Sequence, residues 1–220
     1  TKQQLIERFQ VPKEKIAVIY QTCHETFKKN YPKEAIQAVK TKYHLPKEYL
    51  LNVGTIEERK NTLPLVEAMT LVEPPLVLVG KKTDYFKHIE TVISDKNLED
   101  KVYVIEDVPI EDLALLYQGA KLFVYTSLIE GFGIPLIEAG YSGLPILCNA
   151  TGVFPEAAGS HSCLVEDLSP EHLALRINEL LSNPEQLQTM AKLGQEYSEN
   201  FNEKGIAQQW MQLYESMLKN

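Results

Sequence analysis

Two glutamates, Glu130 and Glu138, flank a short loop that contains the glycines Gly131 and Gly133. The loop follows residues 122–125, an apolar Leu-Phe-Val-Tyr run of the kind that forms a buried parallel strand. The two glycines allow a sharp turn and a close approach of the backbone to a ligand. We therefore expect both carboxylates to line one cleft at the end of this strand.

A helix is predicted to begin at the far side of this loop, near Pro135. Proline suits the first helical turn, where its missing N–H removes no helical hydrogen bond. The free N–H groups and the positive end of the helix dipole favour an anion such as a phosphate. An ionised carboxylate only accepts hydrogen bonds, so Glu130 and Glu138 indicate a ligand that also presents hydroxyl groups.

A pair of adjacent cations, Arg59 and Lys60, follows a second apolar run, residues 49–53, and the glycine Gly54. A glycine at a strand end lets the chain pass under a ligand. Lysine as a point charge and arginine with its planar fork can together neutralise a diphosphate. The alternative is that both are solvated surface charges.

The composition is that of an acidic soluble protein. The 220 residues carry a formal net charge of −8, which argues against nucleic acid as a main partner. The histidines are scattered, and no acidic D-x-D-like pair ends a strand, so we expect no metal site. The cysteines Cys23, Cys148 and Cys163 lie in or beside apolar segments without C-x-x-C spacing, which predicts buried free thiols in a reducing compartment.

The segment from Glu130 onward, Glu-Gly-Phe-Gly-Ile-Pro-Leu-Ile-Glu-Ala, resembles the E-x7-E signature of the retaining, nucleotide-sugar-dependent glycosyltransferases of family four, the group 1 transferases. The resemblance implies that Glu130 lies near the donor sugar and that Glu138 holds the ribose of the nucleotide. It also assigns nucleotide binding to the loop and helix start, which are Phe132, Gly133, Ile134 and Pro135. No cofactor is implied, because the nucleotide-diphosphate sugar is a substrate.

The resemblance extends to the segment Gly54…Arg59-Lys60-Asn61, which binds the donor diphosphate in that family. Lys60 matches the lysine of the pattern. Many members place an arginine directly after the glycine, where this chain has Thr55, and Arg59 is the candidate substitute.

A third segment, Asp107-Val108, corresponds to the place where family members hold the nucleotide base with backbone groups. The usual glycine and aromatic residue are replaced here by Glu106 and Asp107, so no side-chain role transfers. A plain turn is the alternative.

Apolar runs alternate with helical patterns along the chain. Strands are predicted at 16–20, 49–53, 76–79, 102–105, 122–125 and 146–148. Helices are predicted at 2–9, 84–97, 110–118, 170–182, 184–199 and 203–218. Three more helices are predicted by one end only: the first ends near residue 43, the second begins near residue 62 and the third ends near residue 142. Strands alternating with helices predict a doubly wound, Rossmann-like parallel sheet of about six strands, covered on both faces. By resemblance this is the C-terminal, donor-binding half of a GT-B glycosyltransferase.

We expect three parts: an interdomain segment (1–14), the donor-binding domain (15–200) and a C-terminal helix (201–220). Trp210, Met211, Leu213, Tyr214 and Met217 form an apolar stripe on this helix. The stripe packs either on its own domain or on an N-terminal acceptor domain, which we expect in a longer protein. Without that domain, this half is expected to bind nucleotide weakly and to transfer nothing.

The sequence has no signal peptide and no apolar run long enough to span a bilayer. We expect a cytoplasmic protein, with any peripheral attachment to the inner membrane face made through the N-terminal half. Two other functions stay open: a non-catalytic nucleotide-binding subunit of a two-chain transferase, and a nucleotide-sugar epimerase.

Overall fold

Short apolar runs of the sequence form the strands of a single parallel sheet in the computed structural model, which describes residues 2–218. Within these residues the strand order is β3-β2-β1-β4-β5-β6, and every pairing is parallel. The strands are β1 (Leu50–Val53), β2 (Leu76–Val79), β3 (Val102–Ile105), β4 (Leu122–Tyr125), β5 (Ile146–Asn149) and β6 (Cys163–Val165). The order reverses between β1 and β4, so the ligand crevice expected in such a sheet lies beyond the carboxyl ends of these two strands.

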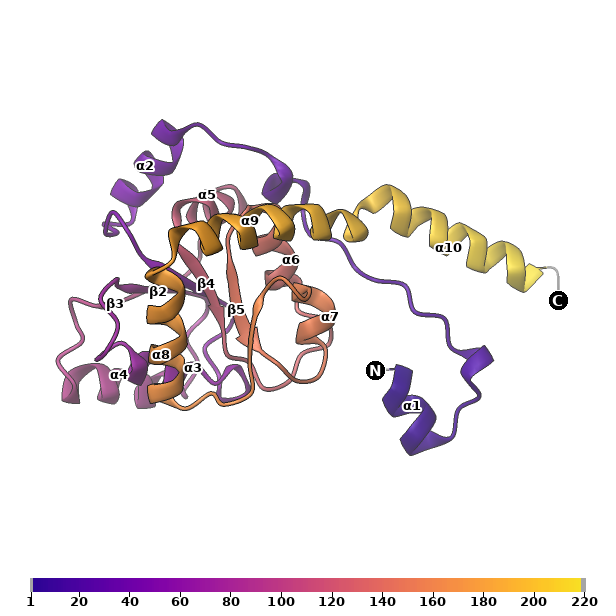
Figure 1. The fold of residues 1–220 in the computed structure, drawn as a ribbon, viewed down its shortest axis with the longest axis horizontal. Coiled ribbons are helices and arrows are strands. Elements are labelled where there is room, and N and C mark those ends of the chain that lie inside the picture. Colours follow the sequence, from indigo (N-terminus) through magenta and orange to yellow (C-terminus); the bar gives the residue numbers. More distant parts are fainter. Residues whose placement is uncertain (1, 219–220) are drawn as a thin grey trace.

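Helices connect the strands and cover both faces of the sheet (Figure 1). The α-helices are α1 (Lys2–Phe9), α2 (Lys33–Lys42), α3 (Thr62–Ala68), α4 (Phe86–Asp95), α5 (Ile110–Gly119), α6 (Ile134–Tyr141), α7 (Phe154–Ala158), α8 (Pro170–Leu181), α9 (Pro184–Ser198) and α10 (Glu203–Leu218). The 3-10 helices are η1 (Lys13–Lys15), η2 (Glu25–Lys28), η3 (Glu58–Lys60) and η4 (Glu199–Phe201). The predicted doubly wound α/β architecture is confirmed.

The two faces of the sheet carry separate apolar cores. One core contains Phe123 and Tyr125 of β4 together with Tyr117 of α5. The other contains Leu65 of α3 and Leu173 of α8. Every residue of β1, β2, β4 and β5 is buried, as expected for parallel strands covered on both faces.

The strand predicted at 16–20 is wrong. This segment contributes no strand to the sheet, and Val18 is 48% exposed. It leads from η1 towards the domain as an extended strap, on the side of the molecule where α1 lies (Figure 1). An apolar run alone does not decide whether a segment forms a strand, and this segment pairs with none of the six strands of the sheet.

One strand and one α-helix of the structure were absent from the sequence prediction. The strand β6 has three residues and pairs with the far edge of β5, and the helix α7 has five. Both are shorter than the windows over which hydrophobic periodicity can be recognised. The sheet therefore has six strands, as expected, but its sixth strand is β6 and not residues 16–20.

The helix α10 does not pack along its own domain. In its described part only Ile206 is buried, and the apolar stripe from Trp210 to Met217 includes the exposed side chains of Trp210, Met211, Tyr214 and Met217. Figure 1 shows α10 extending away from the sheet, towards the side of the molecule where α1 lies. Own-domain packing of the stripe is therefore wrong for these residues. Of the expected terminal segments, Thr1, Lys219 and Asn220 lie outside the described residues.

The cysteines Cys23, Cys148 and Cys163 are all buried and free, as predicted. No helix within residues 2–218 combines the length and the apolar character needed to cross a bilayer.

Candidate functional site

The ammonium group of Lys60 and the carboxylate of Glu130 form an ion pair at the carboxyl ends of β1 and β4. The Lys60 Nζ lies 2.6 Å from Glu130 Oε1, and both side chains are only 12% exposed. The same carboxylate oxygen accepts hydrogen bonds from the Tyr125 hydroxyl at 2.8 Å and from the Ser127 hydroxyl at 2.8 Å. Arg59 completes the group, with its Nη1 3.2 Å from Glu130 Oε1. We call Arg59, Lys60, Tyr125, Ser127 and Glu130 the Glu130 cluster.

Backbone and side-chain hydrogen bonds fasten the end of β4 to η3 and thereby assemble the Glu130 cluster. The Leu128 N–H donates to the Arg59 carbonyl at 3.0 Å, and the Thr126 hydroxyl donates to the Asn61 carbonyl at 2.9 Å. Asn61 adopts a left-handed backbone conformation, with φ of 50°, and ends η3 directly after Lys60. These contacts bring together residues that are far apart in the sequence at the point where the strand order reverses.

The cluster keeps Glu130 ionised. Burial raises the pKa of this carboxyl group, but hydrogen bonds from Lys60, Ser127 and Tyr125 outweigh burial, and the net effect is a lowered pKa. All contacts of the cluster fall on Oε1, and within residues 2–218 no protein donor reaches Oε2. This second oxygen can accept hydrogen bonds from a ligand.

Glu138 occupies a different environment, on α6. Its Oε2 accepts a hydrogen bond from the Tyr117 hydroxyl of α5 at 2.8 Å. Burial raises the pKa of Glu138 to about 7, and this single hydrogen bond opposes the rise only in part. The charge of Glu138 also contributes to the raised pKa of Tyr125, which places it within electrostatic range of the Glu130 cluster.

The loop between the two glutamates ends at Gly133, whose φ of 98° lies in a region that favours glycine. It forms the N-cap of α6, and Ile134 and Pro135 begin the helix. No side chain within the described residues caps this helix start. The helix start predicted near Pro135 is therefore confirmed, and Glu130 precedes its N-cap by three residues.

The side chain of Phe132 packs on the N-terminal strap. Its ring stacks on Tyr20 with the centroids 5.3 Å apart and the planes at 16°, and it meets the edge of Phe201. The Tyr20 hydroxyl also donates a hydrogen bond to Glu156. Any contact of Phe132 with a nucleotide would consequently use its backbone or the remaining ring surface.

The glycines at the ends of β1 and β2 make room for the site. A Cβ on Gly54 would lie 3.3 Å from the Lys60 Nζ, so the lysine side chain passes over this glycine. A Cβ on Gly80 would lie 1.9 Å from the Gly54 carbonyl oxygen, a distance that no side chain tolerates. The backbone at Gly54 therefore lies against the Lys60 side chain, and the backbone at Gly80 packs against Gly54.

Asp107 and Val108 lie beyond the carboxyl end of β3, two strands away from β1. Asp107 is exposed and has a φ of 52°, and Val108 is partly buried against the aromatic core. Neither residue contacts the Glu130 cluster. Their assignment to the nucleotide base stays a prediction.

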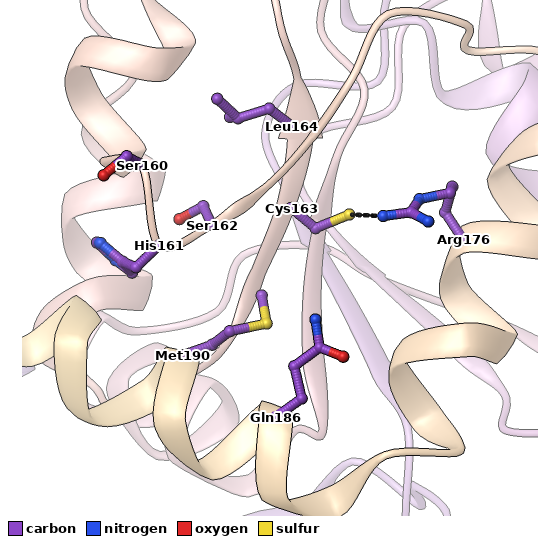
Figure 2. Close-up of a pocket in the computed structure, with 8 residues that line it drawn as sticks. All are labelled: Ser160, His161, Ser162, Cys163, Leu164, Arg176, Gln186 and Met190. Atoms are coloured by element: carbon purple, nitrogen blue, oxygen red, sulfur yellow. Dashed lines mark hydrogen bonds between the residues drawn. The ribbon is translucent and has the colours of Figure 1, made fainter.

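Two cavities adjoin other parts of the molecule. The larger, of about 1040 Å³, is lined by the N-terminal segment, by Phe132 and by Gly152, Val153 and Glu156. The smaller, of about 430 Å³, is shown in Figure 2, where Arg176 of α8 reaches the sulfur of Cys163, with Nη2 and Sγ 3.5 Å apart. Because Cys163 begins β6, this cavity lies at the amino ends of the parallel strands, on the opposite edge of the sheet from Glu130.

The sequence prediction missed the roles of Tyr125, Ser127 and Tyr117. A tyrosine at the last position of an apolar strand and a serine shortly after it were the available signals, but both are common in loops and cores. Within residues 2–218, no group of histidine, cysteine, aspartate and glutamate side chains could hold a metal ion.

The sequence model of the family described as "Glycosyl transferases group 1" matches residues 32–197. The chain belongs to this family. The match covers both the Glu130 cluster and Glu138, and it confirms the resemblance noted from the sequence.

Curated relatives include the O-antigen chain mannosyltransferase B of Escherichia coli, which is 28% identical over 190 residues, 83% of this chain and 50% of that protein. Another is the O-antigen chain mannosyltransferase RfbU of Salmonella typhimurium, 31% identical over 158 residues, 70% of this chain and 41% of that protein. The chain thus spans about half or less of the length of these relatives.

Solved structures confirm the fold. A glycosyltransferase from Rickettsia africae superposes with a TM-score of 0.91 at 20% identity, over 100% of this chain and 62% of that one. The Anabaena protein HepE in complex with UDP gives a TM-score of 0.86 at 21% identity, over 100% of this chain and 61% of that one. A C-terminal domain of a group 1 protein from Francisella tularensis gives 0.67 at 22% identity, with 77% of this chain covering 94% of that domain. The chain has the architecture of one half of a GT-B glycosyltransferase.

Proposed function

We propose that this chain is the donor-binding half of a retaining glycosyltransferase that takes a sugar from a nucleotide-diphosphate sugar. The observation that carries the proposal is the Lys60–Glu130 ion pair, partly buried at the reversal of strand order and next to the uncapped start of α6. Family membership supports the reaction class, and the names of the mannosyltransferase relatives make mannose the first candidate sugar. The Anabaena structure with bound UDP supports a nucleotide ligand for this fold.

In this proposal the diphosphate lies between Lys60 and the helix start at Gly133–Pro135. Negative charge builds on the nucleoside diphosphate as the sugar leaves, and the ammonium group and the helix N–H groups stabilise it. Arg59 adds a second cation at the rim. Fixed positive groups of this type can supply several kcal/mol of transition-state stabilisation, so the reaction needs no metal ion.

The two carboxylates take different roles on the two sides of the diphosphate. Glu138 accepts hydrogen bonds from the ribose hydroxyls. Glu130 accepts hydrogen bonds from hydroxyls of the sugar through Oε2 or stabilises the positive charge that develops on the sugar ring. Asp107 and Val108 hold the base through their backbone. Retention of the anomeric configuration follows from the family resemblance.

The acceptor site belongs to an N-terminal domain in this proposal. Residues 1–14 and 201–220 then form the connection between the two halves, and the exposed stripe of α10 contacts the N-terminal half. These 220 residues alone bind the donor weakly and transfer nothing. Any attachment to a membrane surface is made by that half.

A panel of nucleoside diphosphates and nucleotide sugars, measured by thermal shift and calorimetry, tests the donor site. We expect a guanosine or uridine diphosphate sugar to raise the melting temperature, and we expect Lys60→Ala and Glu138→Ala to abolish the effect. Lys121→Ala is the matched control, because Lys121 pairs with Glu48 at the other edge of the sheet, with 43% and 53% of the side chains exposed. Equal binding by wild type and Lys60→Ala would reject the proposed site.

A turnover assay tests whether transfer requires an N-terminal half in addition to this chain. The chain alone is expected to be inactive, and addition of an N-terminal half, in cis or as a separate chain, is expected to produce transfer. Robust transfer by the 220 residues alone would refute the assignment as a half. Binding without transfer in the joined protein would favour a non-catalytic nucleotide-binding subunit.

A further inference from the structure

The Tyr125 hydroxyl lies between the two charged groups of the Glu130 cluster. It accepts a hydrogen bond from the Lys60 Nζ at 2.9 Å and donates one to Glu130 Oε1 at 2.8 Å. The direct Lys60–Glu130 contact at 2.6 Å closes a triangle of hydrogen bonds. Because a lysine ammonium group only donates and a carboxylate only accepts, this geometry assigns a single direction to the hydroxyl proton, towards Glu130.

The ring that carries this hydroxyl is held rigidly. Tyr125 is 1% exposed and is the last residue of β4. Its ring stacks on Phe123 with the centroids 5.5 Å apart, and it meets Phe154 of α7 at 6.1 Å and an angle of 69°. Burial, followed by the charge of Glu130, raises the pKa of Tyr125 far above its usual value, so the hydroxyl remains a donor.

The Ser127 hydroxyl, the other hydroxyl of the cluster, has acceptors besides the Glu130 carboxylate. Ser127 Oγ reaches Glu130 at 2.8 Å, but it also lies 3.3 Å from the carbonyl oxygens of Arg59 and Ile129. The only acceptor within hydrogen-bond distance of the Tyr125 hydroxyl in the described chain is Glu130. Tyr125 therefore constrains the carboxylate more strongly than Ser127 does.

We propose that Tyr125 is a positioning residue of the donor site, which holds Oε1 of Glu130 against Lys60 so that Oε2 is the oxygen presented to the donor sugar. The inference rests on the proposed function, and it assigns the choice of the carboxylate oxygen that faces the sugar to Tyr125, a residue of strand β4. Tyr125 acts through Glu130 and Lys60 and makes no contact with the substrate.

The first experiment measures the titration of Glu130 by NMR in protein labelled with ¹³C at the glutamate carboxylates, with the resonance assigned by Glu130→Gln. Tyr125→Phe keeps the ring and removes only the hydroxyl. Loss of one hydrogen bond to the ionised form is expected to raise the pKa of Glu130 by about one unit. Ser127→Ala is expected to give a smaller rise.

Tyr49→Phe is the matched control for this measurement. Tyr49 is also a fully buried tyrosine, but its hydroxyl donates to the Leu116 carbonyl at 2.7 Å, outside the Glu130 cluster. It tests whether loss of any buried tyrosine hydroxyl moves the titration of Glu130, and no change is expected. A folded Tyr125→Phe protein with the same Glu130 titration as wild type would overturn the proposal.

If Tyr125→Phe does not fold, a variant that keeps the hydroxyl at position 125 tests the same proposal. Fluorotyrosine placed at position 125 makes the hydroxyl a stronger donor without removing it. The pKa of Glu130 should then fall, the opposite direction from Tyr125→Phe, and an unchanged or raised value would overturn the proposal.

Ligand binding connects the positioning role to the function. With UDP-glucose and GDP-mannose as probes, Tyr125→Phe should weaken binding of the nucleotide sugar that the wild type prefers by roughly 10-fold, the effect of about one hydrogen bond. Binding of the corresponding nucleoside diphosphate should change by less than about 3-fold, because Lys60 keeps its direct contact with Glu130. An equal loss for both ligands would contradict the role at Oε2, whereas absence of all nucleotide binding in wild type would reject the proposed function and leave the NMR result to decide about Tyr125.

Discussion

Glu130 lies in the loop after β4 and Glu138 lies in the helix α6 that follows, and the fold surrounds the two side chains differently. Glu130 lies among donors: an ammonium group, a guanidinium group and two hydroxyls converge on one of its oxygens. Glu138 receives one hydroxyl, from Tyr117. Both are removed from bulk water in large part, yet the pKa of Glu130 is lowered and that of Glu138 is raised to about 7.

This difference shows that the E-x7-E spacing does not define the chemistry of its two glutamates. Burial disfavours the charged form of each carboxyl group, and only Glu130 has enough donors to reverse the effect. Glu130 consequently stays negatively charged, which suits the role that we propose for it beside the positive charge on the sugar. The pKa of Glu138 is raised to about 7, so the charge of this carboxyl group, and with it the ribose contact that we propose, depends on pH near neutrality.

The largest expected effect comes from removing Lys60, the cation that pairs with Glu130 and has no counterpart beside Glu138 within residues 2–218. Lys60→Ala leaves the Glu130 carboxylate partly buried without its main partner. We expect the affinity for a nucleotide sugar to fall by at least 100-fold, or about 3 kcal/mol, measured by calorimetry. Lys121→Ala, at the exposed pair with Glu48, should change it by less than about 2-fold. A loss below about 5-fold for Lys60→Ala would show that the ion pair is not central to binding.

The second prediction uses the opposite pKa shifts of the two glutamates. The folded-state pKa of Glu138 is above its ordinary value of 4.5, so its stabilising contribution is complete below pH 4.5 and is lost as the pH rises through about 7. Glu138→Gln cannot ionise, and it should therefore be more stable than wild type by roughly 3 kcal/mol at pH 8.5, with little difference at pH 4.5. Urea unfolding at several pH values measures this difference.

Glu130→Gln should show the reverse pattern in the same experiment. Because the pKa of Glu130 is lowered, its stabilising contribution is present above the unfolded pKa and is lost as the pH falls through the folded one. The variant should be less stable than wild type at pH 7, and the difference should shrink in acid. Two variants with the same pH dependence would mean that the two environments do not differ as described.

The third prediction concerns the loop that holds the two glutamates apart. Gly133→Ala places a side chain at a φ of 98° and puts its Cβ 3.1 Å from Leu136 Cδ1. We expect a loss of stability of roughly 1–2 kcal/mol and weaker nucleotide binding, since the start of α6 must move. Gly131→Ala is the control, because no atom lies within 4 Å of the Cβ position there. Similar losses in both variants would exclude backbone strain at Gly133 as the cause.

The smallest effect is expected at Arg59. Its side chain is 43% exposed and is shared between Glu57 and Glu130, so solvent screens the interaction. Arg59→Ala should change the stability by less than about 1 kcal/mol. A loss of nucleotide affinity as large as that of Lys60→Ala would make Arg59 an equal partner at the diphosphate.

The sequence by itself determined the features that depend on a few neighbouring residues. An apolar run followed by glycines and a proline specifies a buried strand, a sharp turn and a helix start, and the structure has all three between β4 and α6. Alternation of such runs with helical patterns determined the parallel α/β sheet. Because the carboxyl ends of parallel strands share one edge, Lys60 and Glu130 could be expected to lie near each other before any coordinates.

Only the tertiary structure decided which side chains complete the site and which apolar runs join the sheet. Residues 16–20 look like a strand but have no partner, whereas the shorter β6 finds one on β5. Tyr125 and Ser127 reach Glu130, and Tyr117 reaches Glu138 from another helix, through packing between distant segments. The physical reason is that strand pairing, burial and the number of donors around a charge are properties of the surroundings in space, and local sequence patterns do not encode them.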